Sequence, residues 1–258
     1  MLPSLFIAHG SPQLAIEKSD YTNDLLQLGR GLGGVEAIVV FSAHWVSRNV
    51  SLTYSDESME TMYDFGGFPQ ELYDVVYPAS GSIQVSEEVA KLLEGSGIEV
   101  NRNTRRGLDH GVWVILSHMY PEANIPVIAV SVNPILSPEE QYRIGQTIAA
   151  LKERNIVVIG SGGTVHNLRT IDFHSEEHVD EWAKEFDNWL IEHLRKWDIT
   201  SLFDYKRLAP HSALATPDYE HFLPLFIAMG CGDGSRKVEL LHQSYKYGSL
   251  SHLILQFD

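Results

Sequence analysis

The stretch AIVVFSAH at residues 37–44 decides the fold class of this chain. Its first seven residues are apolar or small, which is typical of a strand that is buried on both faces. SLFIA at 4–8 and NIVVIG at 155–160 have the same character. Because such strands alternate with helical patterns along the chain, we predict an α/β fold. We expect a single domain over residues 1–258, with a central, mostly parallel or mixed β-sheet and helices on both faces.

Other patterns locate individual elements. VELLHQSY at 238–245 and SHLILQF at 251–257 predict two closing strands that could pair as an antiparallel hairpin. A helix is expected to begin at Ser86 and to end at Gly95. Pro224 lies within a further helical pattern, so that helix is expected to bend or begin there.

The composition excludes several classes of partner. The formal net charge is -15, and both nucleic acid and anionic membranes attract the opposite sign, so we expect neither as a partner. No apolar run approaches the ~20 residues of a membrane span, and the N-terminus lacks the basic start of a signal peptide. Cys231 is the single cysteine and cannot form an internal disulfide, so we expect a cytoplasmic protein. The oligomeric state stays open.

Three histidines each follow one of the predicted buried strands. His9 follows SLFIA, His44 follows AIVVFSA, and His166 follows NIVVIGSGGTV. Ligands of α/β sheets collect outside the carboxyl ends of the strands, so these imidazoles are expected to converge at one edge of the sheet. Converging neutral imidazoles indicate a divalent metal, because a ring nitrogen offers its lone pair without first losing a proton.

Two more histidines have a similar setting. His110 lies in LDHGVW at a junction between a loop and a helix, and His221 follows PDYE at the start of a helical pattern. Glycines or other small residues adjoin most of these five histidines, which is hard to explain by packing alone. We therefore include both residues among the candidates for a metal site.

The remaining motifs favour ordinary structural roles. GRGLGG at 29–34 contains G-x-G-x-x-G, but it follows a helix and precedes a strand, the reverse of a dinucleotide site. HSEEH at 174–178 matches an inverted zinc-protease motif, but the segment is polar on all sides and favours a solvated helix entry. His211 lies in a loop that could line the site. Four histidines in apolar elements are expected in the core or on the surface: His118, His193, His242 and His252.

Seven stretches together resemble one enzyme family. They run in family order over nearly the whole chain, and the combination is specific although no single stretch is. The sequence is similar to the class III extradiol ring-cleaving dioxygenases, in particular to the DOPA 4,5-dioxygenase branch of the LigB-like superfamily. The stretches are AHGSP (8–12), VVFSAHW (39–45), YDFGGFPQELYD (63–74), GLDHGVWVIL (107–116), GSGGTVHNLRT (160–170), EHFLPL (220–225) and YGSLS (247–251).

The resemblance implies a role for each of the five histidines. It implies that His9, His44 and His221 are metal ligands. His166 would be the acid–base residue over the open face of the metal, close enough to coordinate it when substrate is absent. His110 would orient or stabilise bound oxygen or substrate. The segment TPDYEHFLPL carries one residue more than many relatives do, so either His221 or Glu220 could face the metal.

The implied reaction is ring opening of a small, DOPA-like catechol by O2. Fe(II) is the implied catalytic metal, because a site with three protein ligands leaves positions for the diol and for oxygen. Zinc binds imidazoles more tightly and is expected in the purified protein. The loop 63–69, with Tyr63, Phe65 and Phe68, could form an aromatic wall or simply pack in the core. Two alternatives remain: a zinc-dependent hydrolase, and a non-catalytic metal- or protein-binding member of the same fold.

Overall fold

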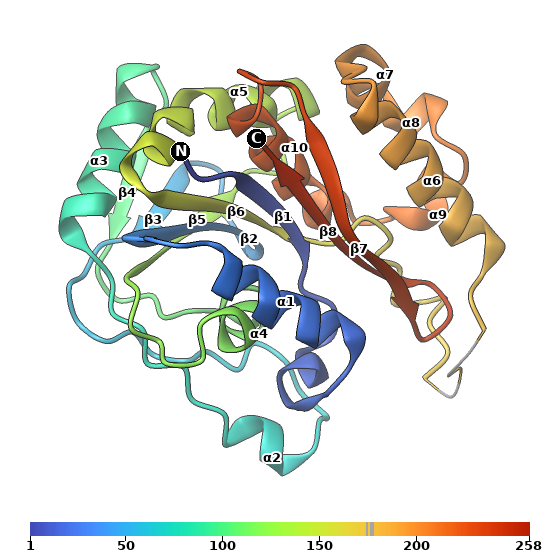
Figure 1. Ribbon diagram of the computed structural model, residues 1–258, viewed down its shortest axis with the longest axis horizontal. Helices are drawn as coiled ribbons and strands as arrows, with labels where there is room; N and C mark the ends of the chain where they lie inside the picture. The colour runs from blue at the N-terminus through green and yellow to red at the C-terminus, as the bar shows by residue number, and fades with distance from the viewer. Residues whose placement is uncertain (174, 176–177) are drawn as a thin grey trace.

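The computed structural model describes residues 1–173, 175 and 178–258, and within them eight strands form one sheet (Figure 1). The strand order is β4-β3-β5-β2-β6-β1-β8-β7. The strands are β1 (Ser4–Ala8), β2 (Ala37–Val46), β3 (Val50–Thr53), β4 (Val100–Asn103), β5 (Val127–Val132), β6 (Ile156–Gly162), β7 (Val238–Lys246) and β8 (Leu250–Phe257).

The sheet is mixed. The central strands β5, β2, β6 and β1 are parallel to one another. At one side β3 is antiparallel to β5, and β4 pairs with β3 in parallel. At the other side β8 is antiparallel to β1, and β7 is antiparallel to β8. The predicted α/β class and the closing hairpin are both confirmed.

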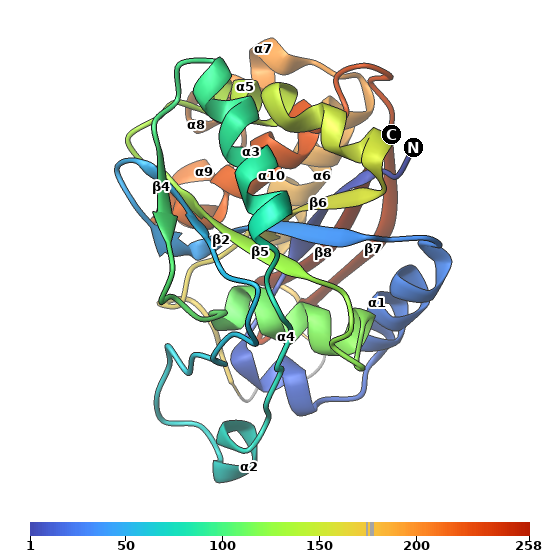
Figure 2. The ribbon, with the colours of Figure 1, turned by 90° about the vertical axis from the view of Figure 1, so that its left-hand side faces the viewer.

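Helices cover both faces of the sheet (Figure 2). One apolar cluster packs α1 and α4 against one face, and two more pack α3, α5, α6 and α10 against the other. The α-helices are α1 (Asp20–Gly31), α2 (Gln70–Tyr73), α3 (Ile83–Gly95), α4 (His110–Met119), α5 (Pro138–Ile148), α6 (Glu181–Arg195), α7 (Ile199–Phe203), α8 (Tyr205–Leu208), α9 (Ser212–Ala215) and α10 (Leu223–Cys231). The 3-10 helices are η1 (Pro12–Ile16), η2 (Ala149–Arg154) and η3 (Tyr219–His221).

Two helix starts bear on the sequence predictions. Helix α3 begins at Ile83, not at Ser86, because the Ser82 hydroxyl caps it by accepting from the Val85 backbone N–H. Ser86 is buried one turn further along and donates to the Thr53 carbonyl. Helix α10 begins at Leu223, next to Pro224. Of the two outcomes predicted for Pro224, a bend or a helix start, the structure shows the helix start.

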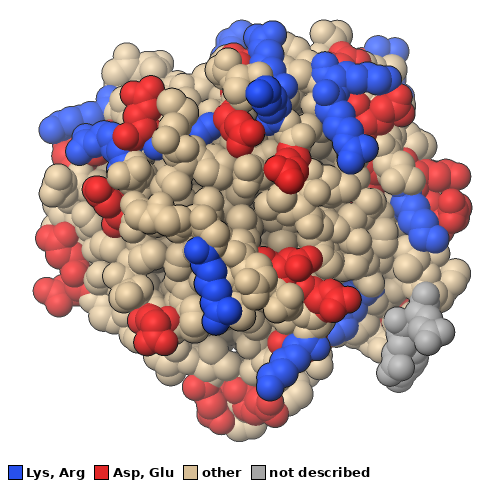
Figure 3. Space-filling view, viewed as in Figure 1, with Lys and Arg blue, Asp and Glu red and all other residues tan. Residues whose placement is uncertain are grey.

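The surface agrees with the charge argument. On the face shown in Figure 3, Lys and Arg side chains lie singly or in small groups among Asp and Glu side chains. The described residues of that face form no continuous cationic field of the kind that binds nucleic acid. None of the described helices combines the length and apolar character that a membrane crossing requires.

The sheet brings the predicted histidines to one edge. His9 directly follows β1, and His166 lies four residues after β6. His44 lies within β2, beyond the predicted end of that strand, where the register against β5 shifts between Ser42 and Val46. Because of this irregularity, β2 continues beyond Ser42, and His44 lies outside the regular pairing between β2 and β5.

Gly162 allows η3, which carries His221, to reach the same edge of the sheet. A Cβ atom on Gly162 would lie 2.0 Å from the His221 carbonyl oxygen, far inside van der Waals contact. The bare backbone of β6 therefore lets η3 approach closely. The Gly163 N–H donates to the same carbonyl at 2.8 Å, so His221 is held directly against the end of β6.

A buried carboxyl group in the core behind this edge gives the fold a pH dependence. Asp187 of α6 is fully buried and accepts a hydrogen bond of 2.6 Å from the Ser251 hydroxyl. Burial, which outweighs this hydrogen bond, raises the pKa of Asp187 from 3.8 to about 6. Because the pKa of Asp187 is higher in the folded than in the unfolded state, protonated Asp187 contributes its full share to the free energy of unfolding below pH ~4. This contribution is lost as the pH rises through ~6.

We therefore predict that Asp187→Asn removes part of the pH dependence of folding. Between pH 4 and pH 7 the wild-type free energy of unfolding should fall by up to about 3 kcal/mol more than that of the variant. Urea unfolding of both proteins at several pH values in this range measures the difference. Parallel stability profiles for the two proteins would contradict the prediction.

Candidate metal centre and substrate pocket

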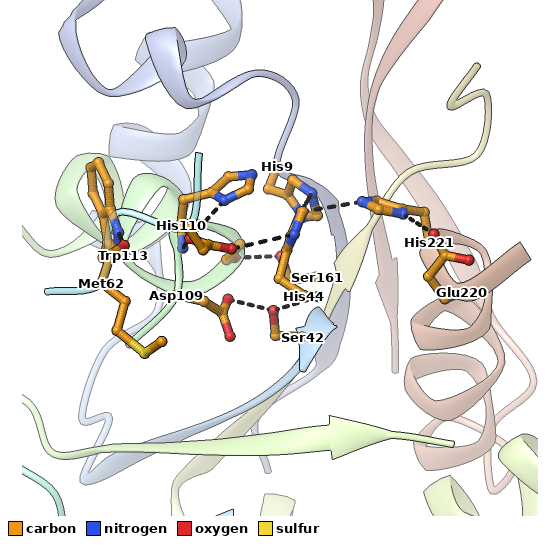
Figure 4. A network of polar contacts seen from close by, with 12 residues as sticks. His9, Ser42, His44, Met62, Asp109, His110, Trp113, Ser161, Glu220 and His221 are labelled. Carbon is orange, nitrogen blue, oxygen red and sulfur yellow. Dashed lines mark hydrogen bonds and ion pairs between the residues drawn. The ribbon is translucent and has the colours of Figure 1, made fainter. Parts of the chain in front are cut away.

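Three imidazole nitrogens face one another at the sheet edge (Figure 4). The Nε2 atom of His44 lies 2.9 Å from Nε2 of His9 and 3.2 Å from Nε2 of His221. Two ligands held ~2.1 Å from one metal ion at right angles to each other lie ~3.0 Å apart. The spacing of these nitrogens is therefore that of neighbouring ligands around a single ion.

The partner of each Nδ1 atom determines the tautomer. The Ser161 hydroxyl donates its one proton to the Gly111 carbonyl, so Nδ1 of His9, at 2.9 Å, must donate to Ser161. Nδ1 of His44 faces the Asp64 carboxylate at 3.4 Å, and Nδ1 of His221 faces the Glu220 carboxylate at 3.1 Å. A carboxylate only accepts, so the His221 imidazole carries its proton on Nδ1, and the carboxylate beside His44 favours the same tautomer there.

Each Nε2 atom of these three rings is consequently left with a lone pair. Lone pairs 2.9 and 3.2 Å apart repel one another, and no proton is available to sit between them. A cation at their meeting point removes the repulsion, and hydrogen bonds at the outer nitrogen are typical of histidines that ligate metals. The donor set thus fits a divalent metal ion.

His110 lies beside the same cluster. Asp64 accepts two hydrogen bonds from it, at 2.9 Å from the backbone N–H and at 3.0 Å from Nδ1. The rings of His110 and His44 lie 3.8 Å apart. Ligand atoms of His9, His44 and His110 all lie within 4.8 Å of one another, so the geometry offers His110 as well as His221 for the third ligand position.

The electrostatics keep His9 and His44 neutral. Burial, reinforced by the neighbouring imidazoles, lowers the pKa of His9 well below its usual value and lowers the pKa of His44 to about 2. Burial would raise the pKa of Asp64, but hydrogen bonding to His110 and the neighbouring histidines outweigh it and hold the value at about 2. Neutral rings beside an ionised carboxylate are the protonation states that metal binding needs.

A buried ion pair holds the backbone of His44 from both sides. The Asp109 carboxylate accepts from the Ser42 hydroxyl at 2.6 Å and from Arg106 at 3.0 Å. Ser42 Oγ in turn accepts from the His44 N–H, while Arg106 donates to the His44 carbonyl. The guanidinium also lies 4.5 Å above the ring of Trp45. Fixing both backbone groups orients the imidazole before any metal binds.

His166 has a different position from the other four histidines. Its ring stacks on that of His221 with centroids 3.6 Å apart and an angle of 7° between the planes. Burial, followed by the neighbouring His221 and His110, lowers the pKa of His166 to about 2. The ring is therefore neutral, and the same burial makes it a weak base.

The cluster opens into a pocket of about 620 Å³. His44, His110, His166 and His221 form its polar floor. The lining also has a large apolar part, to which these residues contribute: Pro12, Phe65, Phe68, Leu168, Ile171, Phe173, Pro217 and Leu250. A mostly apolar wall with a few convergent polar groups suits a small aromatic ligand.

The loop 63–69 combines both of the roles considered for it. Phe65 and Phe68 line the pocket, and the Phe65 ring lies 5.6 Å from that of His110. Tyr63 does not line this pocket; it packs against Trp113 and donates to the Val75 carbonyl. Within this loop, the two phenylalanines therefore form the aromatic part of the pocket wall.

The histidines expected outside the site lie outside it. The imidazole of His211 pairs with Glu185 at 2.6 Å and does not line the pocket, so the suggestion that it could was wrong. His118 bonds the Leu14 carbonyl, and His193 stacks on Trp189. His242 pairs with Asp24, and His252 stacks on Tyr21. Positions 174, 176 and 177 of the H-x-x-E-H motif lie outside the described residues.

Comparison with known proteins identifies the family. Residues 5–258 match the model of the catalytic LigB subunit of aromatic ring-opening dioxygenase. The chain belongs to the LigB family. The predicted extradiol ring-cleaving dioxygenase is thereby confirmed at the level of the family, whose members are oxidoreductases that depend on a metal.

Relatives of this LigB chain cover almost its full length. The 4,5-DOPA dioxygenase extradiol of Beta vulgaris is 40% identical over 253 residues, which are 96% of this chain and 94% of that protein. The protein of the same name from Escherichia coli K12 is 35% identical and covers 99% of this chain and 94% of its own length. The crystal structure of an uncharacterized Escherichia coli K12 protein superposes with a TM-score of 0.85 at 32% identity, covering 100% of both chains.

Sequence reasoning missed the residues that hold the imidazoles. Asp64 was quoted within YDFGGFP and Ser161 within GSGG, but neither was given a role. Their partners lie 46 and 152 positions away in the chain, so only the folded structure pairs them. The acidic residue among the aromatics and glycines of loop 63–69 was the one local signal available.

Asp64→Asn should weaken metal binding by about 10- to 100-fold, because Asp64 is the acceptor that both His44 and His110 share. An anaerobic competition titration against a chelator gives the dissociation constant. Asp74→Asn is the matched control, because Asp74 is an exposed aspartate ten residues further along the chain. Equal metal affinity in the Asp64 variant and the control would refute a role for Asp64 in positioning the ligands.

Proposed function

We propose that the protein is an extradiol dioxygenase that opens the ring of a small catechol by inserting both atoms of O2 beside the diol. The observation that carries this proposal is the meeting of three Nε2 lone pairs on the floor of an apolar pocket. Membership of the LigB family supports it. Residues 1–258 would then act as one catalytic domain, working in the cytoplasm.

His9, His44 and His221 are the proposed metal ligands. His221 is preferred to His110 for the third position because its Nε2 atom directly faces that of His44 at 3.2 Å. Glu220 is assigned the outer role, since its carboxylate holds Nδ1 of His221. Of the two residues that the sequence left open, Glu220 and His221, we therefore propose His221 as the ligand.

Iron(II) is the proposed catalytic metal, and when bound it would supply a redox-active centre with open positions for catechol and O2. Zinc binds the same imidazoles more tightly by the divalent affinity order, so aerobically purified protein is expected to contain zinc. Dependence on a metal is a property of the family, whereas the choice of iron is our proposal.

His166 is the proposed base for a catechol hydroxyl. Its neutral ring lines the pocket beside the proposed ligand His221. Burial weakens the ring as a base, and the negative charge that develops on a deprotonated catechol would offset this effect. The ring stacks on that of His221 with centroids 3.6 Å apart, and we assign it proton transfer and not coordination of the metal.

His110 is proposed to orient bound substrate or oxygen through its Nε2 atom, because Asp64 holds the proton of the ring on Nδ1. Asp64 holds its Nδ1 atom, which turns the other edge of the ring toward the cluster. Phe65 packs edge-on against it from the pocket wall. A ring fixed on two sides delivers its polar atom to one place at little entropic cost.

Oxygen uptake by anaerobically Fe(II)-loaded protein tests the proposed function. With L-DOPA, 3,4-dihydroxyphenylacetate and protocatechuate, we expect one O2 consumed per catechol and a yellow ring-opened product. No uptake with iron bound would contradict a dioxygenase. Ester or amide hydrolysis by the zinc form without oxygen would then favour the alternative zinc hydrolase.

Two single variants separate the metal ligands from the proton-transfer residues. His221→Ala should lose bound metal and activity together, whereas His110→Ala should keep its metal and lose most of its turnover, by about 100-fold or more. Metal content by elemental analysis and oxygen uptake on the same samples measure both effects. Metal loss in His110→Ala with retention in His221→Ala would reverse the ligand assignment.

A further inference from the structure

One cationic side chain lines the substrate pocket among the residues that the structure describes, and it is Arg169. It follows His166 by three residues, so the two Cα atoms are at most about 11 Å apart. The guanidinium is exposed, and within the described chain no carboxylate lies within ion-pair distance of it. The backbone N–H of Arg169 donates to Oδ1 of Asn167, which ties this turn to the floor of the pocket.

Of the three carboxylates that line the pocket, two are already engaged, and the third, Asp218, is exposed. Asp64 holds two imidazoles, and Glu220 holds His221. Arg169 is different because it adjoins the apolar side chains of Leu168 and Ile171 and has no such partner. An unpaired guanidinium at the edge of an apolar pocket is suited to a planar anion, above all to a carboxylate.

The charge of the whole molecule strengthens this interpretation. A chain with a formal net charge of -15 repels an anionic ligand, and salt screens this repulsion only beyond ~8 Å. A pocket for an anionic catechol therefore needs a local cation that acts at short range. Arg169 is the residue that supplies it.

We propose that Arg169 binds a carboxylate on the side chain of the catechol and thereby selects catechols that carry a carboxylate over those that lack one. The inference rests on the proposed function: the diol lies at the imidazole cluster and the tail extends toward Arg169. The carboxylate is far from the reacting ring carbons, so Arg169 is a specificity residue and not a catalytic one.

Steady-state kinetics on a matched set of catechols tests the proposal. For Arg169→Gln we expect KM to rise about 10- to 100-fold with L-DOPA and with 3,4-dihydroxyphenylpropionate, with kcat changed by less than about twofold. The kcat/KM values for dopamine and 4-methylcatechol should stay within about twofold of wild type, since neither carries a carboxylate. Arg169→Lys should recover part of the loss, because an ammonium retains the charge without the paired donors.

Arg105→Gln is the matched control. Arg105 is also exposed and its loss changes the net charge equally, but it lies outside this pocket, in a neighbouring polar hollow. The control should leave all four substrates unaffected. An equal effect of both variants would mean that net charge acts rather than a contact, and would overturn the proposal.

Anaerobic calorimetry separates this proposal from the proposed function. Binding of 3,4-dihydroxyphenylpropionate and of 4-methylcatechol to metal-loaded wild type and Arg169→Gln is measured without turnover. Selective loss of acid binding in the variant supports the role of Arg169 even if no catechol is oxidised. Unchanged acid binding, or equal weakening of both ligands, overturns it even if the enzyme opens catechol rings.

Discussion

The polar partner at each Nδ1 atom is the interaction on which the site depends. Hydrogen bonds to Ser161 and Glu220 fix the proton of His9 and of His221 on the outer nitrogen, and the Asp64 carboxylate, 3.4 Å from Nδ1 of His44, favours the same position. The inner nitrogens are then forced to present lone pairs to one another, an arrangement that is unfavourable until a cation fills it. Metal binding at their meeting point relieves this mutual repulsion.

The fold supplies these hydrogen-bonding partners from distant parts of the chain. Parallel strands β1, β2 and β6 end at one edge, and the close approach of η3 to Gly162 brings His221 to the same place. The pair of Arg106 and Asp109 then fixes the backbone of His44. Loss of Arg106 alone would leave the buried Asp109 carboxylate uncompensated next to the metal ligands, so stability and site geometry are coupled.

The sequence predicted the architecture and the five site histidines because both depend on local patterns. Apolar runs mark buried strands, and His9, His44 and His166 stand where such runs end. The short helices α7 to α9 went unpredicted, since four or five residues show no helical periodicity. Ser86 was mistaken for a helix cap because Ser82, one turn earlier, offers the same chemistry. The roles of Asp64 and Ser161 depend on tertiary pairing, which no local pattern encodes.

The central claim is that three imidazoles bind the metal and leave one face of it open to the pocket. Metal-edge X-ray absorption on the Fe(II)-loaded protein, before and after anaerobic addition of a catechol, tests this most directly. We predict scattering from three imidazoles in both states, with only lighter oxygen ligands exchanged when the catechol binds. A closed set of four protein ligands, or the loss of an imidazole from among His9, His44 and His221 on catechol binding, would contradict the account.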